Sequence, residues 1–313
     1  MYKIAGIDIG GTKISGAIIE NSTIVSDIII KKTPFCTKDI INTAFDIIRQ
    51  LQNFSKIDAI AVATAGAVNN ENSKVIGSTG NLPHDYSEAD FKKIFEDEFC
   101  LPFLIENDAN AAAYAEHKEG AAKGCTNSIT VTLGTGVGGG IIINNKLLKG
   151  KSGAAGEIGH IILGIEEKRH CTCGMYNCFE AYASGTGFKK TIQELSLSCQ
   201  EFKNSKLADK SYDELSTYDV IKGNKDGDIF CKIAYETWEK ELIIGLISLA
   251  NIFDTEAIVI SGGLSAEVNY EKVEKAVNQS IVTTPLKIVP AKAGNYSGMI
   301  GAALLAQEKF KKN

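Results

Sequence analysis

The chain has 313 residues and a mass of 33.6 kDa, and its 44% hydrophobic and 23% charged residues are typical of globular proteins. Its 33 basic and 38 acidic side chains leave a net charge of −5, which argues against a protein built to bind nucleic acid. No apolar run approaches the roughly 18 residues that span a membrane, and the N-terminus shows no signal peptide, so we expect a cytoplasmic protein.

The first third of the sequence alternates strand and helix patterns. Ile-rich stretches bounded by glycine or asparagine predict strands, and apolar residues at helical spacing predict helices. In chain order, we predict strands over 3–9, 13–20, 23–32, 57–63 and 102–105, and helices over 38–53, 88–99 and 107–119.

The remaining sequence repeats this order with longer helices. We predict strands over 128–133, 137–143, 146–148, 257–260 and 286–289 and a mostly irregular segment over 150–180. We predict helices over 185–253, interrupted near 223–227, and over 267–280 and 297–311. Two groups of three strands, each followed by alternating helices and strands, predict an α/β protein with two domains and a duplicated βββαβαβα-type unit. We assign residues 1–117 and the C-terminal helix 298–313 to a small domain, and residues 118–297 to a large one.

The segment DIGGTK at residues 8–13 lies in a turn between two predicted strands. Paired glycines let backbone N–H groups turn toward an anion, and threonine and lysine add a hydroxyl and a positive charge. An ordinary hairpin turn needs only the glycines, so the added polar residues favour phosphate binding. No segment of the sequence has the spacing of a Walker A loop.

The segment GTGVGGG at residues 134–140 contains a GxGxxG match, but it runs into a β-rich sequence, whereas a dinucleotide fingerprint opens a helix. We therefore predict a second strand–turn–strand of the same design as the first. Two such turns facing each other across an interdomain cleft would hold a polyphosphate from both sides.

The segment ENDAN at residues 106–110 lies where a predicted strand gives way to a helix. Helix capping needs only one Asn or Asp at such a position. Proteins of the α/β class also place reactive groups at the carboxyl ends of strands, and an Asp there can accept the proton of an attacking hydroxyl. On the residues alone, both interpretations stand.

Residues 156–160 read GEIGH, and residues 171–178 read CTCGMYNC. One histidine and three cysteines within nineteen residues, in a loop with little hydrophobic sequence, predict a tetrahedral zinc site that braces the loop and places Glu157 and Glu180. A disulfide is the second interpretation and conflicts with a reducing compartment, and a catalytic thiol is the third.

Taken together, these segments resemble the ROK family of bacterial sugar kinases and sugar-responsive repressors, which has the actin/hexokinase-like ATPase fold. The resemblance extends over essentially the whole chain, as far as SGG at 261–263 and SGMIGAALLA at 297–306. It implies ATP- and magnesium-dependent transfer of phosphate to a hexose, with glucose as the first candidate and its 6-hydroxyl as the acceptor.

The resemblance also implies roles for individual residues. Asp108 would be the catalytic base, and Asp8 would help to hold magnesium. The implied sugar contacts are Asn81, Asn107, Asp108, Glu157, His160 and Glu180. The implied ATP contacts are Gly10, Gly11, Thr12, Lys13, Gly134, Thr135, Gly136, Gly262 and Gly263. The implied zinc ligands are His160, Cys171, Cys173 and Cys178, with one histidine nitrogen on the metal and the other facing the sugar.

The sequence departs from the family pattern at two places. Asn177 stands where the family usually has glycine, and asparagine tolerates the same left-handed backbone angles. The segment PHDY at 83–86 lacks the Pro-Gly-Trp of many family glucokinases. This second departure leaves N-acetylmannosamine, N-acetylglucosamine and fructose as alternative substrates.

A sugar-sensing repressor is the alternative from another class of protein. Repressors of this family carry a helix-turn-helix ahead of the first phosphate turn, and here that turn begins at Asp8. We therefore expect an enzyme whose partners are ATP and a hexose or N-acetylhexosamine, without nucleic acid or membrane. The resemblance further implies a homodimer or homotetramer.

Overall fold

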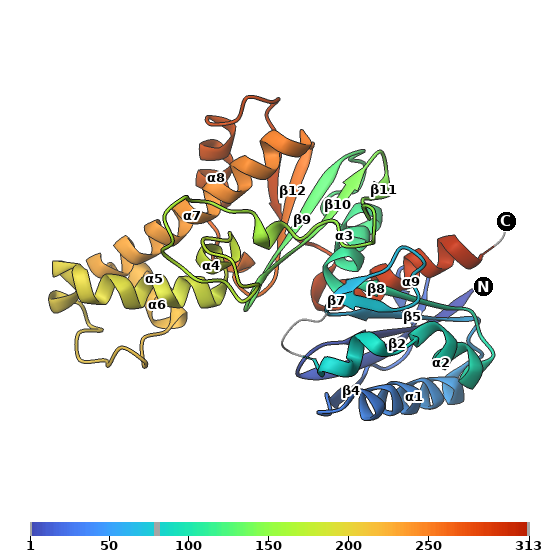
Figure 1. Ribbon diagram of the computed structural model, residues 1–313. Coiled ribbons are helices and arrows are strands. Elements are labelled where there is room, and N and C mark those ends of the chain that lie inside the picture. Colours follow the sequence, from blue (N-terminus) through green and yellow to red (C-terminus); the bar gives the residue numbers. More distant parts are fainter. Residues whose placement is uncertain (1, 78–81, 312–313) are drawn as a thin grey trace. The chain divides into compact units, whose positions relative to one another are not determined.

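The computed structural model describes residues 2–77 and 82–311, and the chain divides into two compact units (Figure 1). Unit 1 comprises Met1–Thr130, Gly140–Gly156 and Ala291–Asn313, and unit 2 comprises Val131–Gly139 and Glu157–Pro290. Contacts group 118–130 and 140–156 with unit 1, although the predicted domain boundary placed them in the large domain. That boundary between functional domains stays a prediction.

Unit 1 contains a six-stranded sheet of order β3-β2-β1-β5-β8, in which β4 also pairs with β2. Its strands are β1 (Lys3–Ile9), β2 (Lys13–Glu20), β3 (Thr23–Ile24), β4 (Ile29–Lys32), β5 (Ala59–Thr64) and β8 (Phe103–Asn107). β1 and β2 are antiparallel, whereas β1, β5 and β8 are parallel to one another. The carboxyl ends of these three parallel strands therefore meet at one edge of the sheet.

Helices cover both faces of this sheet (Figure 1). They are α1 (Thr37–Phe54), α2 (Phe91–Phe99), α3 (Asp108–Glu119) and α9 (Ser297–Phe310). On one face, Ile47 of α1 and Phe95 of α2 join a buried core with Ile7 of β1. On the other face, Met299 of α9 joins a second core with Ile4 of β1. The β1 side chains thus alternate between the two cores, as the pleat of a strand requires.

Two short elements of unit 1 lie between β5 and α2. β6 (Ala67–Val68) and β7 (Val75–Gly77) pair as an antiparallel hairpin. A single 3₁₀ turn, η1 (His84–Glu88), comes before α2. Neither element was predicted, because strands of two or three residues and a single 3₁₀ turn are too short to show a periodic pattern.

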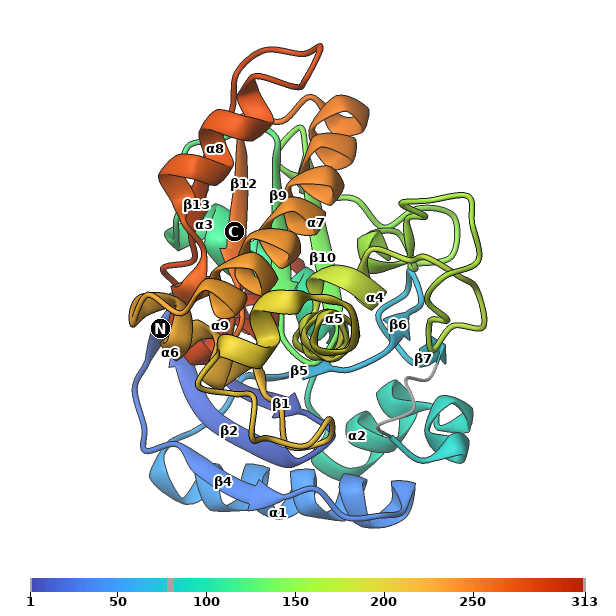
Figure 2. The same ribbon diagram turned by 90° about the vertical axis from the view of Figure 1, so that its left-hand side faces the viewer.

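The second sheet has the order β11-β10-β9-β12-β13. Its strands are β9 (Ser128–Leu133), β10 (Val137–Ile143), β11 (Lys146–Leu147), β12 (Ala257–Ser261) and β13 (Lys287–Pro290). The helices of unit 2 are α4 (Glu180–Ala183), α5 (Gly185–Ser198), α6 (Thr217–Lys225), α7 (Ile229–Phe253) and α8 (Tyr270–Asn278). The long helix α7 contacts the other four (Figure 2). Its buried Trp238 stacks on Phe188 of α5.

Two predicted elements have different bounds in the structure. The strand predicted over 23–32 is split into β3 and β4, because the Ser26 hydroxyl replaces a carbonyl of the ladder and accepts the Ile18 N–H at 2.9 Å. The helix predicted from residue 88 begins at Phe91, because Asp90 caps it by accepting a backbone N–H of the first turn at 3.1 Å.

The helical region predicted over 185–253 is also interrupted more widely than expected. An irregular stretch separates α5 from α6 and contains one short 3₁₀ segment, η3 (Gln200–Asn204). The two sheets and their connecting helices nevertheless confirm the predicted α/β class. Within 2–77 and 82–311, no helix is both long enough and apolar enough to span a membrane.

Candidate active site

A tight turn, Gly10–Lys13, joins β1 to β2 in unit 1. The Gly10 N–H donates to the Lys13 carbonyl at 3.0 Å, and the Thr33 hydroxyl donates to the Gly10 carbonyl at 2.6 Å. Gly11 and Thr12, at the tip of the turn, are exposed. The backbone of the turn is therefore held in place, while its outward N–H groups and polar side chains can meet an anion.

Asn107 ends β8 and Asp108 begins α3, at the edge where the carboxyl ends of the parallel strands meet. Asn107 caps the helix by accepting the Asn110 N–H at 3.0 Å. Asp108 is exposed, and its carboxylate accepts the Ala109 N–H at 2.8 Å. Because a helix N-terminus stabilises negative charge, this edge carries an accessible carboxylate that is held in one orientation.

Asp8 lies near the end of β1 in the same sheet. Burial, together with the charge of Asp108, raises the pKa of Asp8 to about 6, and the Lys13 ammonium acts in the opposite direction. Two carboxylates that repel each other would be stabilised by a divalent cation, and Mg2+ prefers oxygen ligands of this kind. The donor chemistry at this edge therefore fits magnesium.

Glu106 supports this edge from within the sheet. It is 1% exposed, and an acidic residue at the end of an apolar strand is the feature of the sequence that points to such a buried, paired carboxylate. A buried carboxylate with all its partners in place is rigid, so Glu106 holds the backbone from which Asp108 projects. Its partners are the Asn107 N–H (3.0 Å), the side-chain amides of Asn110 (3.2 Å) and Asn72 (2.8 Å), and the Lys149 ammonium (2.9 Å).

In unit 2, a second glycine turn joins β9 to β10 and is held by distant residues. The Gly134 N–H donates to the Gly136 carbonyl at 3.0 Å, and the Gly185 N–H donates to the Gly134 carbonyl at 2.8 Å. The Glu180 carboxylate accepts the Val137 N–H at 2.9 Å. A Cβ on Gly136 would lie 2.3 Å from that carboxylate, so any larger residue there would have to displace the Glu180 side chain.

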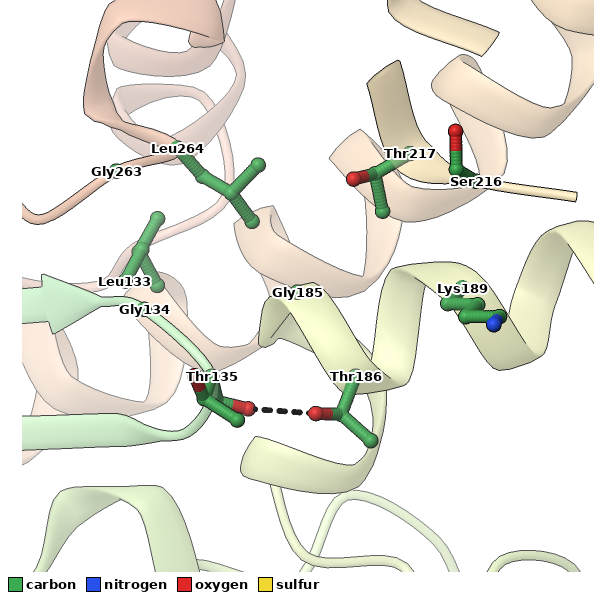
Figure 3. A pocket seen from close by; sticks show the side chains of 10 residues that line it. All are labelled: Leu133, Gly134, Thr135, Gly185, Thr186, Lys189, Ser216, Thr217, Gly263 and Leu264. Atoms are coloured by element: carbon green, nitrogen blue, oxygen red, sulfur yellow. Dashed lines mark hydrogen bonds between the residues drawn. The ribbon is translucent and has the colours of Figure 1, made fainter. Parts of the chain in front are cut away.

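The second turn borders a cavity of about 550 Å³ within unit 2 (Figure 3). Of the predicted ATP contacts in this unit, Gly134, Thr135 and Gly263 line the cavity, whereas Gly136 and Gly262 are not among its lining residues. The Thr186 hydroxyl donates to the Thr135 carbonyl at 2.9 Å and joins the turn to α5 (Figure 3). The lining residues are Leu133, Gly134, Thr135, Gly185, Thr186, Lys189, Ser216, Thr217, Gly263 and Leu264.

Half of this lining comes from helix starts that the sequence analysis did not single out, namely Gly185, Thr186, Lys189, Ser216 and Thr217. Ser184 caps α5 by accepting the Gly187 N–H at 3.0 Å, and Ser216 caps α6 by accepting the Asp219 N–H at 3.2 Å. Serine before a helical pattern is a common N-cap, so both helix starts could have been located within the region predicted to hold helices.

The four predicted metal ligands gather in unit 2, at the two ends of a segment that we name the metal loop (residues 160–178). The ligand atoms of His160, Cys171, Cys173 and Cys178 all lie within 4.8 Å of one another. His160 Nδ1 is 3.7 Å from Cys171 Sγ, and Cys173 Sγ is 3.6 Å from Cys178 Sγ. A tetrahedral ion with zinc–sulfur bonds of about 2.3 Å would separate its ligands by about 3.8 Å. The cluster therefore has the donor set and the spacing of a four-coordinate metal site.

The thiols of this cluster differ in how readily they ionise. Burial raises the pKa of Cys178 to about 12, whereas a hydrogen bond from the Met175 backbone lowers the pKa of Cys173. A metal ion binds thiolates, so it must displace the proton of Cys178 in particular. Metal affinity is therefore expected to fall as the pH falls.

The predicted sugar contacts of unit 2 lie beside the metal cluster. His160 turns Nδ1 toward Cys171 and Nε2 toward Glu157, whose Oε2 lies 3.9 Å away. One ring nitrogen thus faces the metal ligands and the other faces a partly exposed carboxylate. The remaining predicted contact, Asn81, lies outside the described residues.

Glu180 connects the metal loop to the second glycine turn. Its Oε1 accepts the Thr172 hydroxyl at 3.3 Å, and its Oε2 accepts the Val137 N–H. One carboxylate therefore contacts both segments.

The chain is similar in sequence and in structure to known proteins. The profile of the ROK family matches residues 4–309. The glucokinase of Streptomyces coelicolor is 33% identical over 315 residues, which cover 97% of each chain. The xylose repressor of Bacillus spizizenii is 28% identical over 97% of this chain and 77% of its own. A solved ROK family glucokinase from Streptomyces griseus, in complex with glucose and AMPPNP, has a TM-score of 0.80 at 30% identity, covering 98% of this chain and 99% of that one.

Proposed function

The chain belongs to the ROK family, with the actin/hexokinase-like ATPase fold, and we propose that it is an ATP-dependent glucokinase acting on the 6-hydroxyl of glucose. Its likeness to the Streptomyces coelicolor glucokinase over nearly the full length of both chains supports a sugar kinase. The observation that carries the proposal is the exposed Asp108 at the start of α3, on the same sheet edge as Asp8. A carboxylate in this position suits the removal of a proton from a sugar hydroxyl.

In the proposed reaction, Asp108 accepts the proton of the sugar hydroxyl as the hydroxyl oxygen attacks the γ-phosphorus of ATP. A bond forms between that oxygen and phosphorus, the bond from phosphorus to the β–γ bridging oxygen breaks, and ADP leaves. The Ala109 N–H holds the carboxylate in place, and Glu106 holds the backbone beneath it. General-base catalysis of this kind contributes about 10²- to 10⁴-fold in rate.

We infer ATP contacts in each unit. In unit 1 they are Gly10, Gly11, Thr12 and Lys13, and in unit 2 they are Gly134, Thr135 and Gly136 for phosphate and Gly262 and Gly263 for adenosine. The cavity of unit 2 supports this assignment, because it combines Gly134 and Gly263 with the start of α5. Glycine turns and helix N-termini both present N–H groups to anions.

The sugar contacts are Asn107 and Asp108 in unit 1 and Glu157, His160 and Glu180 in unit 2, while Asn81 stays a prediction. The Glu157 and Glu180 carboxylates accept hydrogen bonds from sugar hydroxyls, whereas His160 with Nδ1 on the metal carries its proton on Nε2 and donates one. Their support by the metal loop and the second turn is the structural argument for placing sugar recognition there.

The two implied metal ions have separate sites. The metal loop fits zinc, because three thiols and an imidazole at this spacing are its preferred structural donors, and the loop would gain a cross-link that holds His160 near Glu157. Asp8 would hold Mg2+, which neutralises the charge of the phosphates during phosphoryl transfer.

The test is an ADP-release assay with Mg2+, zinc and ATP across glucose, mannose, fructose, N-acetylglucosamine and N-acetylmannosamine. We expect kcat/KM to be highest with glucose. A higher value with fructose or an N-acetylhexosamine would change the substrate and keep the reaction, because such sugars differ by a few hydrogen bonds and by pocket shape. No turnover with any of the five sugars would contradict the kinase proposal.

A sugar-sensing repressor is the second candidate, because the xylose repressor matches nearly the whole of this chain. The net charge of −5 counts against it, since DNA binding needs a basic surface. Calorimetric titration with the same five sugars separates the candidates: sugar binding without ADP release would favour the repressor. Light scattering on the same samples tests the homodimer or homotetramer implied by the resemblance.

A further inference from the structure

Asn177, inside the metal loop, combines a left-handed backbone with a buried side chain. Its φ is +58°, and the residue is 2% exposed. Glycine adopts this φ freely and asparagine tolerates it, so the backbone alone does not require an asparagine. A buried amide also needs hydrogen-bond partners, and those partners show what the side chain does.

The Asn177 amide joins several parts of the metal loop. Its oxygen accepts hydrogen bonds from two backbone N–H groups and one hydroxyl, and its nitrogen donates to two backbone carbonyls. The partners are the Lys168 N–H (3.3 Å), the Arg169 N–H (3.1 Å), the Tyr182 hydroxyl (2.7 Å) and the carbonyls of Gly164 (3.3 Å) and Glu166. These bonds hold the segment 164–169 in one conformation and connect it to α4, which carries Tyr182.

Arg169 extends this network from the metal loop to α4 and α5. Its side chain is almost fully buried, and its guanidinium lies 4.4 Å from the centroid of the Tyr182 ring. A planar guanidinium can bind several acceptors at once in fixed directions, which a lysine cannot do. The acceptors are the carbonyls of Ala181 (3.2 Å) and Gly187 (3.4 Å), the Thr191 hydroxyl (2.9 Å) and the Glu194 carboxylate (2.7 Å).

The helix that this network holds, α4, has four residues and begins with Glu180. A helix of one turn is not stable without tertiary contacts. Apart from the network, α4 is held at its other end by the Trp238 indole N–H, which donates to its last carbonyl at 2.9 Å, and just before its start by the buried Phe179, whose N–H donates to the Ile161 carbonyl at 2.8 Å. Asn177 and Arg169 add the contacts that join α4 to segment 164–169, so the position of Glu180, and with it the hydrogen bond to the Val137 N–H, depends in part on them.

We propose that Asn177, Arg169 and Tyr182 form a clamp that positions Glu180 for the sugar and for the second glycine turn. The three are positioning residues, because they act through Glu180 and α4. The role in sugar binding rests on the proposed function, whereas the bond from Val137 to Glu180 can be followed without any sugar.

The main test is Asn177→Gly, because glycine keeps the left-handed backbone and removes only the side chain. We expect KM for glucose to rise about ten-fold while kcat changes by less than about three-fold, the pattern of a group that supports binding equally before and during the reaction. In hydrogen exchange of the sugar-free protein, the Val137 amide should exchange faster. Metal content, measured by plasma mass spectrometry, should equal that of the wild type.

A second clamp variant and a control variant show whether the effect comes from the clamp. Tyr182→Phe removes a single hydroxyl and keeps the ring beneath Arg169, so we expect the same changes at about two- to three-fold. Lys168→Gln is the matched control, because its N–H remains available to Asn177 and its side chain is 69% exposed in a surface pair with Glu166. The control should match the wild type in KM and in Val137 exchange.

Wild-type KM and wild-type Val137 exchange in Asn177→Gly would overturn the clamp. Loss of metal from that variant would also overturn it, because the effect would then come from the metal cluster. If the wild-type chain phosphorylates no sugar, the proposed function fails, while faster Val137 exchange in Asn177→Gly would still support the clamp.

Discussion

The two glycine turns look alike in sequence but are held in different ways. The first turn takes its hydrogen bond from Thr33, 23 positions away from Gly10 in the chain and next to the same sheet. The second turn takes its bonds from Glu180, 43 positions away from Val137, and from the start of α5. The conformation of the first turn is therefore fixed by residues of neighbouring strands, whereas that of the second turn depends on two helices and on the metal loop that supports Glu180.

This difference predicts how each turn responds to change. A turn held by adjacent strands forms when those strands pair, whereas a turn held across a longer loop also needs the loop to be ordered. We therefore expect damage to the metal loop to reach the second turn and to leave the first turn unchanged. The predictions below test this separation, beginning with the largest expected effect.

Asp108→Asn tests whether Asp108, on the same sheet edge as the first turn, is the catalytic base. We expect kcat to fall by about 10²- to 10⁴-fold, with KM for glucose and ATP near wild type, because the amide cannot accept the proton. ADP release measures kcat. Asp90→Asn is the control, since Asp90 caps α2 and asparagine is an equally good cap. A fall of less than about ten-fold would argue against Asp108 as the base.

Cys178→Ala should disturb the second turn and spare the first. We expect loss of the bound metal, a rise in KM for glucose of about ten- to a hundred-fold, and faster exchange of the Val137 amide, because the loop that supports Glu180 loses its cross-link. The Gly10 amide should exchange as in the wild type. Cys199→Ser is the control outside the metal cluster. Equal acceleration at both amides would show that the two turns are not independent.

Asp8→Asn tests the raised pKa of the buried carboxyl group on the strand that enters the first turn. Because the folded pKa of Asp8 is about 6 and its ordinary value is 3.8, the neutral acid stabilises the fold fully below pH 3.8, and this stability is lost as the pH rises through 6. Relative to wild type, the free energy of unfolding of the variant should therefore grow by about 1–3 kcal/mol between pH 4 and pH 8. Urea titrations at both pH values measure it, and a difference that stays constant with pH would contradict the raised pKa.

Thr33→Val should disturb the first turn and spare the second, the reverse of Cys178→Ala, and it has the smallest expected effect of the four substitutions. It removes the hydroxyl that donates to the Gly10 carbonyl, which should cost about 1 kcal/mol and raise KM for ATP by no more than about five-fold. Here the Gly10 amide should exchange faster, while the Val137 amide should not. Thr43→Val is the control, since that exposed hydroxyl donates only within its own helix. Acceleration at Val137 would contradict the separation.

Much of the fold could be predicted where the pattern is local. The bounds of β1, β2, β9 and β10 agree with those predicted, because each is an apolar run with a glycine turn at one of its ends. The split between β3 and β4 could not be predicted, because it depends on the Ser26 hydroxyl reaching the backbone of the next strand. The irregular stretch between α5 and α6 was missed because its apolar residues are compatible with a helix.

The candidate site divides in the same way. The metal ligands could be predicted, because cysteine and histidine rarely gather in a loop without a metal or a disulfide. The contribution of Lys189 and Thr217 to the cavity could not, because they belong to two helices that approach each other only in the folded unit. Glu106 was visible as an acid in a buried strand, but its four partners were not.

The sequence by itself determined the family, the α/β class, the donor set of the metal loop and the acid that begins α3, because each depends on residue type and short spacing. Only the tertiary structure decided that Glu180 meets Val137, and that Asn177 is tied to α4 through Tyr182. Such contacts are set by which elements pack together, and packing is a property of the whole unit that no local stretch of sequence specifies.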